Sequence, residues 1–112
     1  MNGANDNPTA FVQSLPKDDT SYLPLLKPGR SVKLHSGYVC LQPGESVGEH
    51  STENYEELLI VLSGTGEVET GGENERRPIS ANQVAYNPPQ TTHNVHSTGD
   101  EPLRYIYIVT PV

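Results

Sequence analysis

The chain has a single cysteine, Cys40, and no tryptophan. One cysteine cannot form an intrachain disulfide, and it excludes a metal site built from several thiolates. Cys40 has no basic residue near it in sequence, so we expect it to serve as a small hydrophobic residue of a strand rather than as a reactive thiol. Nothing in the cysteine content conflicts with a reducing, cytoplasmic location.

Basic residues are also scarce, because 7 Lys and Arg stand against 14 Asp and Glu in 112 residues. The net charge of −7 repels a phosphate backbone, so we expect no nucleic-acid partner. Long hydrophobic runs are missing too. The longest aliphatic run, residues 58–62, is far too short to span a bilayer, and residues 1–8 lack a signal pattern. We therefore expect no membrane partner and a cytoplasmic protein.

With 33% hydrophobic residues and ten each of Gly and Pro, the chain can bury only a modest core. We expect residues 1–30 to form an N-terminal tail and extended arm, since prolines at 16, 24 and 28 prevent a long helix there. Residues 31–112 are predicted to form one β-barrel domain. Strand signals between Gly- and Pro-rich turns recur there, without an amphipathic helix, at 32–35, 38–41, 58–62, 66–70, 84–86, 93–96 and 103–109.

Side-chain alternation assigns faces to residues 57–62, because successive residues of a strand point to opposite sides. Glu57, Leu59 and Val61 share one face. If that face is interior, residues 58, 60 and 62 form an apolar outer stripe that needs a cover. Either the arm at residues 11–26 or a second subunit covers it, and we expect a homodimer.

The most informative pattern is Gly44-x5-His50-x-Thr52-x4-Glu57-x6-Gly64, followed later by Pro88-x4-His93. Two imidazoles and one carboxylate can meet around one divalent cation if the strands curl over one another. Such a set suits non-haem iron, zinc, nickel or manganese, and the spacing does not choose between them. Glu57 is the strongest member, because a carboxylate opening a buried aliphatic strand needs a partner charge or a metal.

This first pattern resembles the first motif of the cupin family. Gly44, His50, Glu57 and Gly64 match it, and Thr52 stands where the family has its second histidine. The resemblance covers roughly residues 41–109 and implies an all-β fold, a small double-stranded β-helix or jelly-roll barrel of the cupin type-2 kind.

The second family motif is present in degenerate form. Pro88 and His93 match, whereas Asn82 and Gln90 replace two glycines and Ser97 replaces an asparagine. Because Thr52 replaces a histidine in the first motif, one of the four usual metal ligands is missing. The resemblance implies His50, Glu57 and His93 as the remaining set.

Other polar residues have open interpretations. Thr52 is either a strand residue favoured for its β-branch or a hydroxyl that bonds a metal-bound water. Tyr105 and Tyr107 share a face and are either core rings or donors lining a pocket. We expect His35 and His96 to face solvent. Weak candidates for a general acid or base are Tyr38, Tyr86 and Tyr107.

Three classes of function follow from a metal site of this kind. An enzyme would hold a small oxygen-bearing substrate in the open positions of the cation, as a dioxygenase or as a sugar isomerase or epimerase. A binding protein would capture a small acid or sugar without turnover. A structural metal would only tie strands together. We expect a metal-binding cupin that binds or acts on a small molecule, and the substrate is not readable from the sequence.

Overall fold

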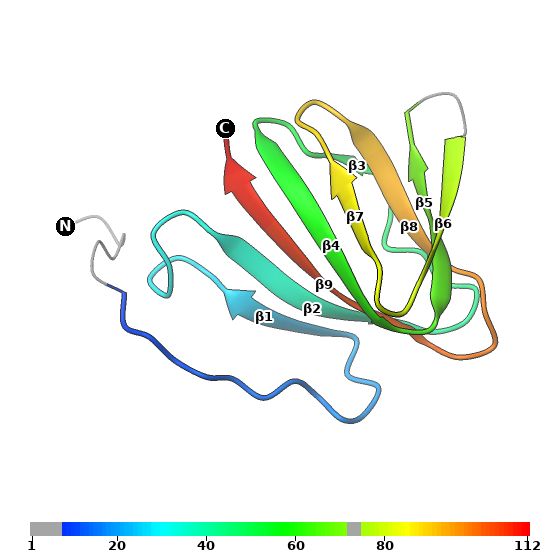
Figure 1. Ribbon diagram of the computed structural model, residues 1–112, viewed down its shortest axis with the longest axis horizontal. Coiled ribbons are helices and arrows are strands. Elements are labelled where there is room, and N and C mark those ends of the chain that lie inside the picture. Colours follow the sequence, from blue (N-terminus) through cyan, green and yellow to red (C-terminus); the bar gives the residue numbers. More distant parts are fainter. Residues whose placement is uncertain (1–7, 72–74) are drawn as a thin grey trace.

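The computed structural model describes residues 8–71 and 75–112, and within them the chain forms nine antiparallel strands in two sheets (Figure 1). The five-stranded sheet has the order β1-β2-β9-β4-β7, and the four-stranded sheet has the order β3-β8-β5-β6. The described residues contain no helix that could span a membrane. The all-β fold predicted from the sequence, a small double-stranded β-helix, is confirmed.

The strands of the larger sheet are β1 (Tyr22–Leu26), β2 (His35–Leu41), β4 (Tyr55–Ser63), β7 (Val84–Asn87) and β9 (Leu103–Pro111). Those of the smaller sheet are β3 (His50–Ser51), β5 (Thr65–Thr70), β6 (Glu75–Ser80) and β8 (Thr92–Ser97).

The core lies between the two sheets and is made of alternate residues of each strand, because every second side chain points inward. Its buried members are Val39, Leu41, Leu59, Val61, Val68, Ile79, Val95, Leu103 and Tyr105. The predicted faces of β4 are confirmed, since Glu57, Leu59 and Val61 are buried while Leu62 is 37% exposed. Cys40 is free and buried on β2, as expected of a strand hydrophobe.

The predicted strand at residues 32–35 was wrong, and the strand β6 was missed. Residues 32–34 are not a strand, because a turn closed by the Arg30 amide on the Lys27 carbonyl leads through bends into β2, which begins only at His35. The strand β6 was missed because it carries Arg76, Arg77 and Pro78, which are poor strand signals. A proline is tolerated there since β6 is an edge strand. Residues 1–7 of the predicted N-terminal tail lie outside the described residues.

The arm is partly built into the larger sheet. Residues 22–26 pair with β2 as β1, and Arg104 on β9 holds the preceding segment by bonds to the Asp18 carbonyl and the Asp19 carboxylate. In Figure 1 residues 8–21 run as an extended segment outside β1. Since β2 and β9 separate β1 from β4, this strand does not lie over the apolar outer stripe of β4.

Candidate metal and ligand site

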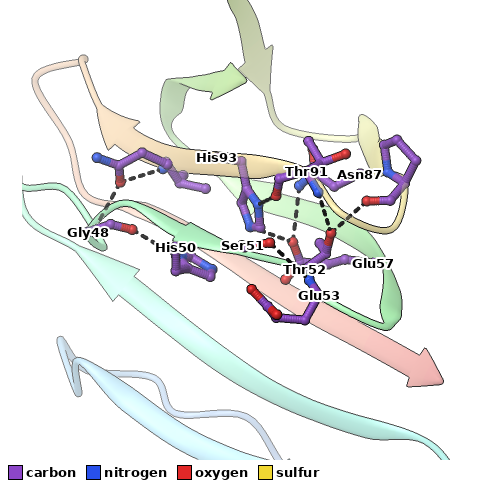
Figure 2. A network of polar contacts seen from close by, with 12 residues as sticks. Gly48, His50, Ser51, Thr52, Glu53, Glu57, Asn87, Thr91 and His93 are labelled. Carbon is purple, nitrogen blue, oxygen red and sulfur yellow. Dashed lines mark hydrogen bonds and ion pairs between the residues drawn. The ribbon is translucent and has the colours of Figure 1, made fainter. Parts of the chain in front are cut away.

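The three residues singled out by the sequence meet where the two sheets face each other (Figure 2). His50 on β3 lies directly opposite His93 on β8, and their ring centroids are 4.2 Å apart. Glu57 comes from β4 of the other sheet, and its Oε1 lies 3.0 Å from Nε2 of His93. The site therefore depends on the packing of one sheet upon the other.

Backbone carbonyls set the tautomer of both histidines. Nδ1 of His50 lies 2.8 Å from the Gly48 carbonyl oxygen, and Nδ1 of His93 lies 3.1 Å from that of Thr91. A carbonyl oxygen only accepts, so each Nδ1 carries the hydrogen. In the neutral rings each Nε2 therefore has a free lone pair. Metal-binding histidines are commonly oriented in this way.

The close contact between His93 and Glu57 is unfavourable if the His93 imidazole is neutral. Nε2 of His93 is buried, and among the described residues it has no hydrogen-bond partner, because its approach to Glu57 has ion-pair distance without hydrogen-bond alignment. A lone pair and a carboxylate oxygen 3.0 Å apart repel each other unless a proton or a cation lies between them. Either would relieve the contact, and two imidazoles with one carboxylate are donors that suit a divalent cation.

Glu57 is held in its ionised form. Burial would raise the pKa of this carboxyl, but His93 and the amide of Asn87 outweigh burial and leave the pKa below its ordinary value. The Asn87 amide donates to Oε1 over 3.0 Å, and Asn87 is only 1% exposed. Burial would lower the pKa of His93, yet the neighbouring Glu57 carboxylate and the Thr91 carbonyl raise it overall. Both pKa shifts favour positive charge beside the Glu57 carboxylate.

The set is only partly preassembled. Within residues 8–71 and 75–112, no group of three or more His, Cys, Asp or Glu side chains forms a ready-made metal site. Glu57 and His93 are buried, whereas His50 is exposed on a strand of two residues. Closing a cation into the site would therefore require an adjustment of His50, the least constrained member.

Thr52 is buried and lines the same cavity, but the backbone uses its hydroxyl. The hydroxyl donates to the Pro88 carbonyl over 2.7 Å and accepts the amide of Thr91 over 3.0 Å. These bonds tie the segment between β3 and β4 to the turn that leads into β8. The hydroxyl proton is thus engaged away from any metal-bound water, and Thr52 holds the two histidine-bearing strands in register.

A cavity of about 700 Å³ opens beside the three residues. Most of its wall is apolar, and among the described residues no Lys or Arg lines it, whereas Glu45 and Glu57 do. Residues of both sheets line the cavity, among them Val39, Leu41, Glu45, Thr52, Glu57, Leu59, Val95, Tyr105 and Tyr107. The prediction that Tyr107 belongs to the pocket is consistent with this wall.

Sequence reasoning missed several contributors. His35 was expected to face solvent but lines the cavity, because β2 begins at His35 and places it opposite Val109. Asn87 was not predicted to belong to the site, although it lies opposite Glu57 in the β4–β7 register. Of the three tyrosines considered as acids or bases, Tyr107 alone is a wall residue. Tyr38 and Tyr86 bond Arg104 and Glu56 instead.

A family model described as "Cupin domain" matches residues 37–109. The chain is a cupin. It is 30% identical over 69 residues to a Thermotoga maritima protein named oxalate-binding protein, covering 62% of this chain and 55% of that protein. The chain therefore spans about half the length of that relative.

Solved structures agree on the fold. A Thermotoga maritima structure described as a predicted oxalate decarboxylase aligns with a TM-score of 0.65 and 26% identity, covering 70% of this cupin and 66% of that chain. A Bacillus halodurans structure has a TM-score of 0.81 and 22% identity, and the alignment covers 97% of this cupin and 86% of that chain. A cupin 2 conserved barrel protein of Salinispora arenicola has a TM-score of 0.73 and 24% identity, and the alignment covers 95% of this cupin and 92% of that chain.

The degenerate cupin motif keeps its backbone shape. Gly44 and Gly64, which match family glycines, have φ of +86° and +85°. Asn82 and Gln90, which replace family glycines, also have positive φ, +70° and +55°. Asparagine tolerates this region well and glutamine less so. All four positions therefore have a left-handed backbone, two of them without glycine.

Proposed function

We propose that this cupin binds a small oxygen-bearing molecule, a carboxylate in the first instance, through a divalent cation held by His50, Glu57 and His93. The observation that carries the proposal is the buried Nε2 of His93 held 3.0 Å from the Glu57 carboxylate at the wall of a cavity, with His50 opposite His93. Iron, zinc, nickel and manganese all suit these donors. When bound, the cation supplies positive charge to ligand oxygens.

The electrostatics of the wall favour a cation-dependent mode of binding. Glu45 and Glu57 are the carboxylates of the cavity, and no described Lys or Arg lines it to offset them. A carboxylate ligand entering such a cavity would be repelled without a cation. The Thermotoga maritima matches, whose names refer to oxalate, a dicarboxylate, support a carboxylate as the class of ligand.

The test is calorimetry on one preparation divided into two. After chelation and reconstitution with Zn²⁺ we expect about one ion per chain by mass spectrometry, and measurable oxalate binding. The chelated half should bind oxalate at least about tenfold more weakly, because the carboxylates of the wall then act alone. Equal oxalate binding by the two halves would contradict the proposal. Formation of formate and CO₂ from ¹³C-labelled oxalate, followed by NMR, would assign this cupin to the enzymes rather than to the binding proteins.

We further propose that the cupin is a homodimer joined through the outer face of β4 and β7. Leu62, Val84 and Tyr86 are 37, 63 and 57% exposed there, and Val84 and Tyr86 lie opposite Ile60 and Leu58. Burial of such a stripe favours association by about 25 cal/mol per Å² of apolar area, before the entropic costs.

Light scattering at micromolar concentration should report a dimer for the natural chain and a monomer for Val84→Lys. Val84 is already exposed, so the lysine costs the monomer little. Val32→Lys is the matched control, because Val32 is 65% exposed but lies outside the strands, and it should remain dimeric. A monomeric natural chain would refute this assembly.

A further inference from the structure

Tyr105 is a phenol buried in the middle of the molecule. It lies on β9, opposite Val39 of β2 and Val61 of β4, and it is 2% exposed. Its side chain points inward with those neighbours and lines the cavity beside the candidate metal site. A tyrosine at such a place needs a partner for its hydroxyl, because a buried O–H without a hydrogen bond is unfavourable.

No such partner is present among the residues that the structure describes. Tyr55, which also lines the cavity, likewise forms no hydroxyl hydrogen bond among the described residues, but it is less buried than Tyr105. The other tyrosine hydroxyls nearby are satisfied. Tyr107 and Tyr22 bond each other over 2.7 Å, and Tyr38 accepts from Arg104 over 2.9 Å. Tyr105 forms no hydrogen bond within residues 8–71 and 75–112. Its hydroxyl is therefore a vacant donor on the wall of a cavity.

The wall around Tyr105 is otherwise apolar. Val39, Leu41, Leu59 and Val95 line the cavity and belong to the hydrophobic core. Tyr105 stands four residues before Val109, which lies opposite Glu57 on the neighbouring strand. Four residues of extended chain separate backbone positions by roughly 13 Å. Tyr105 and the residue opposite Glu57 are therefore anchored at different levels of the cavity wall.

From this arrangement we infer that Tyr105 determines ligand specificity by donating a hydrogen bond to an oxygen at the far end of the ligand. This inference rests on the proposed function, in which the near end is a carboxylate held at the cation. The ligand class is then a monocarboxylic acid with an apolar chain and a distal keto or hydroxyl oxygen. A second carboxylate is disfavoured at the far end, because no described Lys or Arg lines the cavity to neutralise it.

The protonation state of Tyr105 supports a donor role. Burial raises the pKa of Tyr105 above its ordinary value, with the Glu57 and Tyr107 charges acting in the same direction. The phenol therefore keeps its proton at neutral pH and acts as a donor toward a carbonyl oxygen. It holds and orients the ligand rather than transferring a proton.

The test compares keto acids with the acids that lack only the keto oxygen. Calorimetry on Zn²⁺-loaded protein would use three pairs of increasing length: 4-oxopentanoate with pentanoate, 5-oxohexanoate with hexanoate, and 7-oxooctanoate with octanoate. In the natural chain at least one keto acid should bind about 3- to 10-fold more tightly than its partner, the effect of one net hydrogen bond. In Tyr105→Phe that preference should disappear, while the affinity for Zn²⁺ stays the same.

Tyr38→Phe is the matched control, because it also removes a buried tyrosine hydroxyl, but one that bonds Arg104 and does not line the cavity. It should keep the preference. Thermal melts should show Tyr105→Phe at least as stable as the natural chain, since it loses an unpartnered hydroxyl. A preference absent from every pair, surviving in Tyr105→Phe, or lost equally in Tyr38→Phe would overturn the inference.

The same samples separate this inference from the proposed function. If Zn²⁺ and oxalate bind but no keto acid is preferred, the specificity role of Tyr105 fails and the proposed function stands. If Zn²⁺ does not bind to the natural chain, both fail together.

Discussion

Replacing Glu57 with glutamine is expected to weaken the binding of a divalent cation by at least about a hundredfold. Loss of residues that merely support a metal ligand commonly costs 10- to 100-fold, and Glu57 is proposed as a ligand itself. Glutamine keeps the size of the side chain and an oxygen that can accept from Asn87, so the charge is the main thing removed. Competition titrations against a chromophoric chelator would measure the change for Zn²⁺ and Mn²⁺.

Glu56→Gln is the control one residue away. The Glu56 side chain lies on the outer face of β4, where its carboxylate accepts a hydrogen bond of 2.8 Å from the Tyr86 hydroxyl. Its substitution should change metal affinity by less than about threefold, because the charge lies outside the cavity and is screened by water. Similar losses from the two substitutions would mean that Glu57 does not hold the cation. Thermal melts of both variants would separate lost affinity from lost folding.

Replacing Gly64 with alanine should destabilise the fold by about 3 to 5 kcal/mol, combining left-handed backbone strain with overpacking. Gly64 links β4 of one sheet to β5 of the other and has φ of +85°. A Cβ there would lie 2.3 Å from the Pro102 carbonyl oxygen and 2.9 Å from the Leu103 Cα. Both are backbone atoms, so no side chain can turn aside to make room.

Gly44→Ala isolates the first of these two effects. Gly44 has nearly the same φ, +86°, but a Cβ at this position would meet nothing within 4 Å. Its substitution should cost only about 1 to 2 kcal/mol, the strain of a left-handed residue. Urea denaturation of the two variants would measure both values. Equal losses would show that the close approach of β4 to the 102–103 backbone is unimportant.

Short-range physics accounts for what could be predicted. Alternation along residues 57–61 predicted which side chains enter the core, since a strand presents every second residue to one face. The same parity indicated Glu57 rather than Glu56 as the inward carboxylate, and burial of Glu57 to 7% exposure agrees. The edge strand β6 was missed because its proline, Pro78, is tolerated only where one side of the strand lacks a hydrogen-bonded neighbour. That condition depends on the arrangement of the whole sheet.

By itself, the sequence determined the all-β class, the cupin motifs and the inward face of β4, and it predicted His50, Glu57 and His93 as a candidate metal-binding set. These features lie in spacing and periodicity, which are properties of the chain. Only the tertiary structure placed Glu57 of one sheet 3.0 Å from His93 of the other, engaged the Thr52 hydroxyl with Pro88 and Thr91, and left the Tyr105 hydroxyl without a partner on the cavity wall. The physical reason is that hydrogen-bond satisfaction is decided by which segments meet in space, and these segments are distant in the sequence.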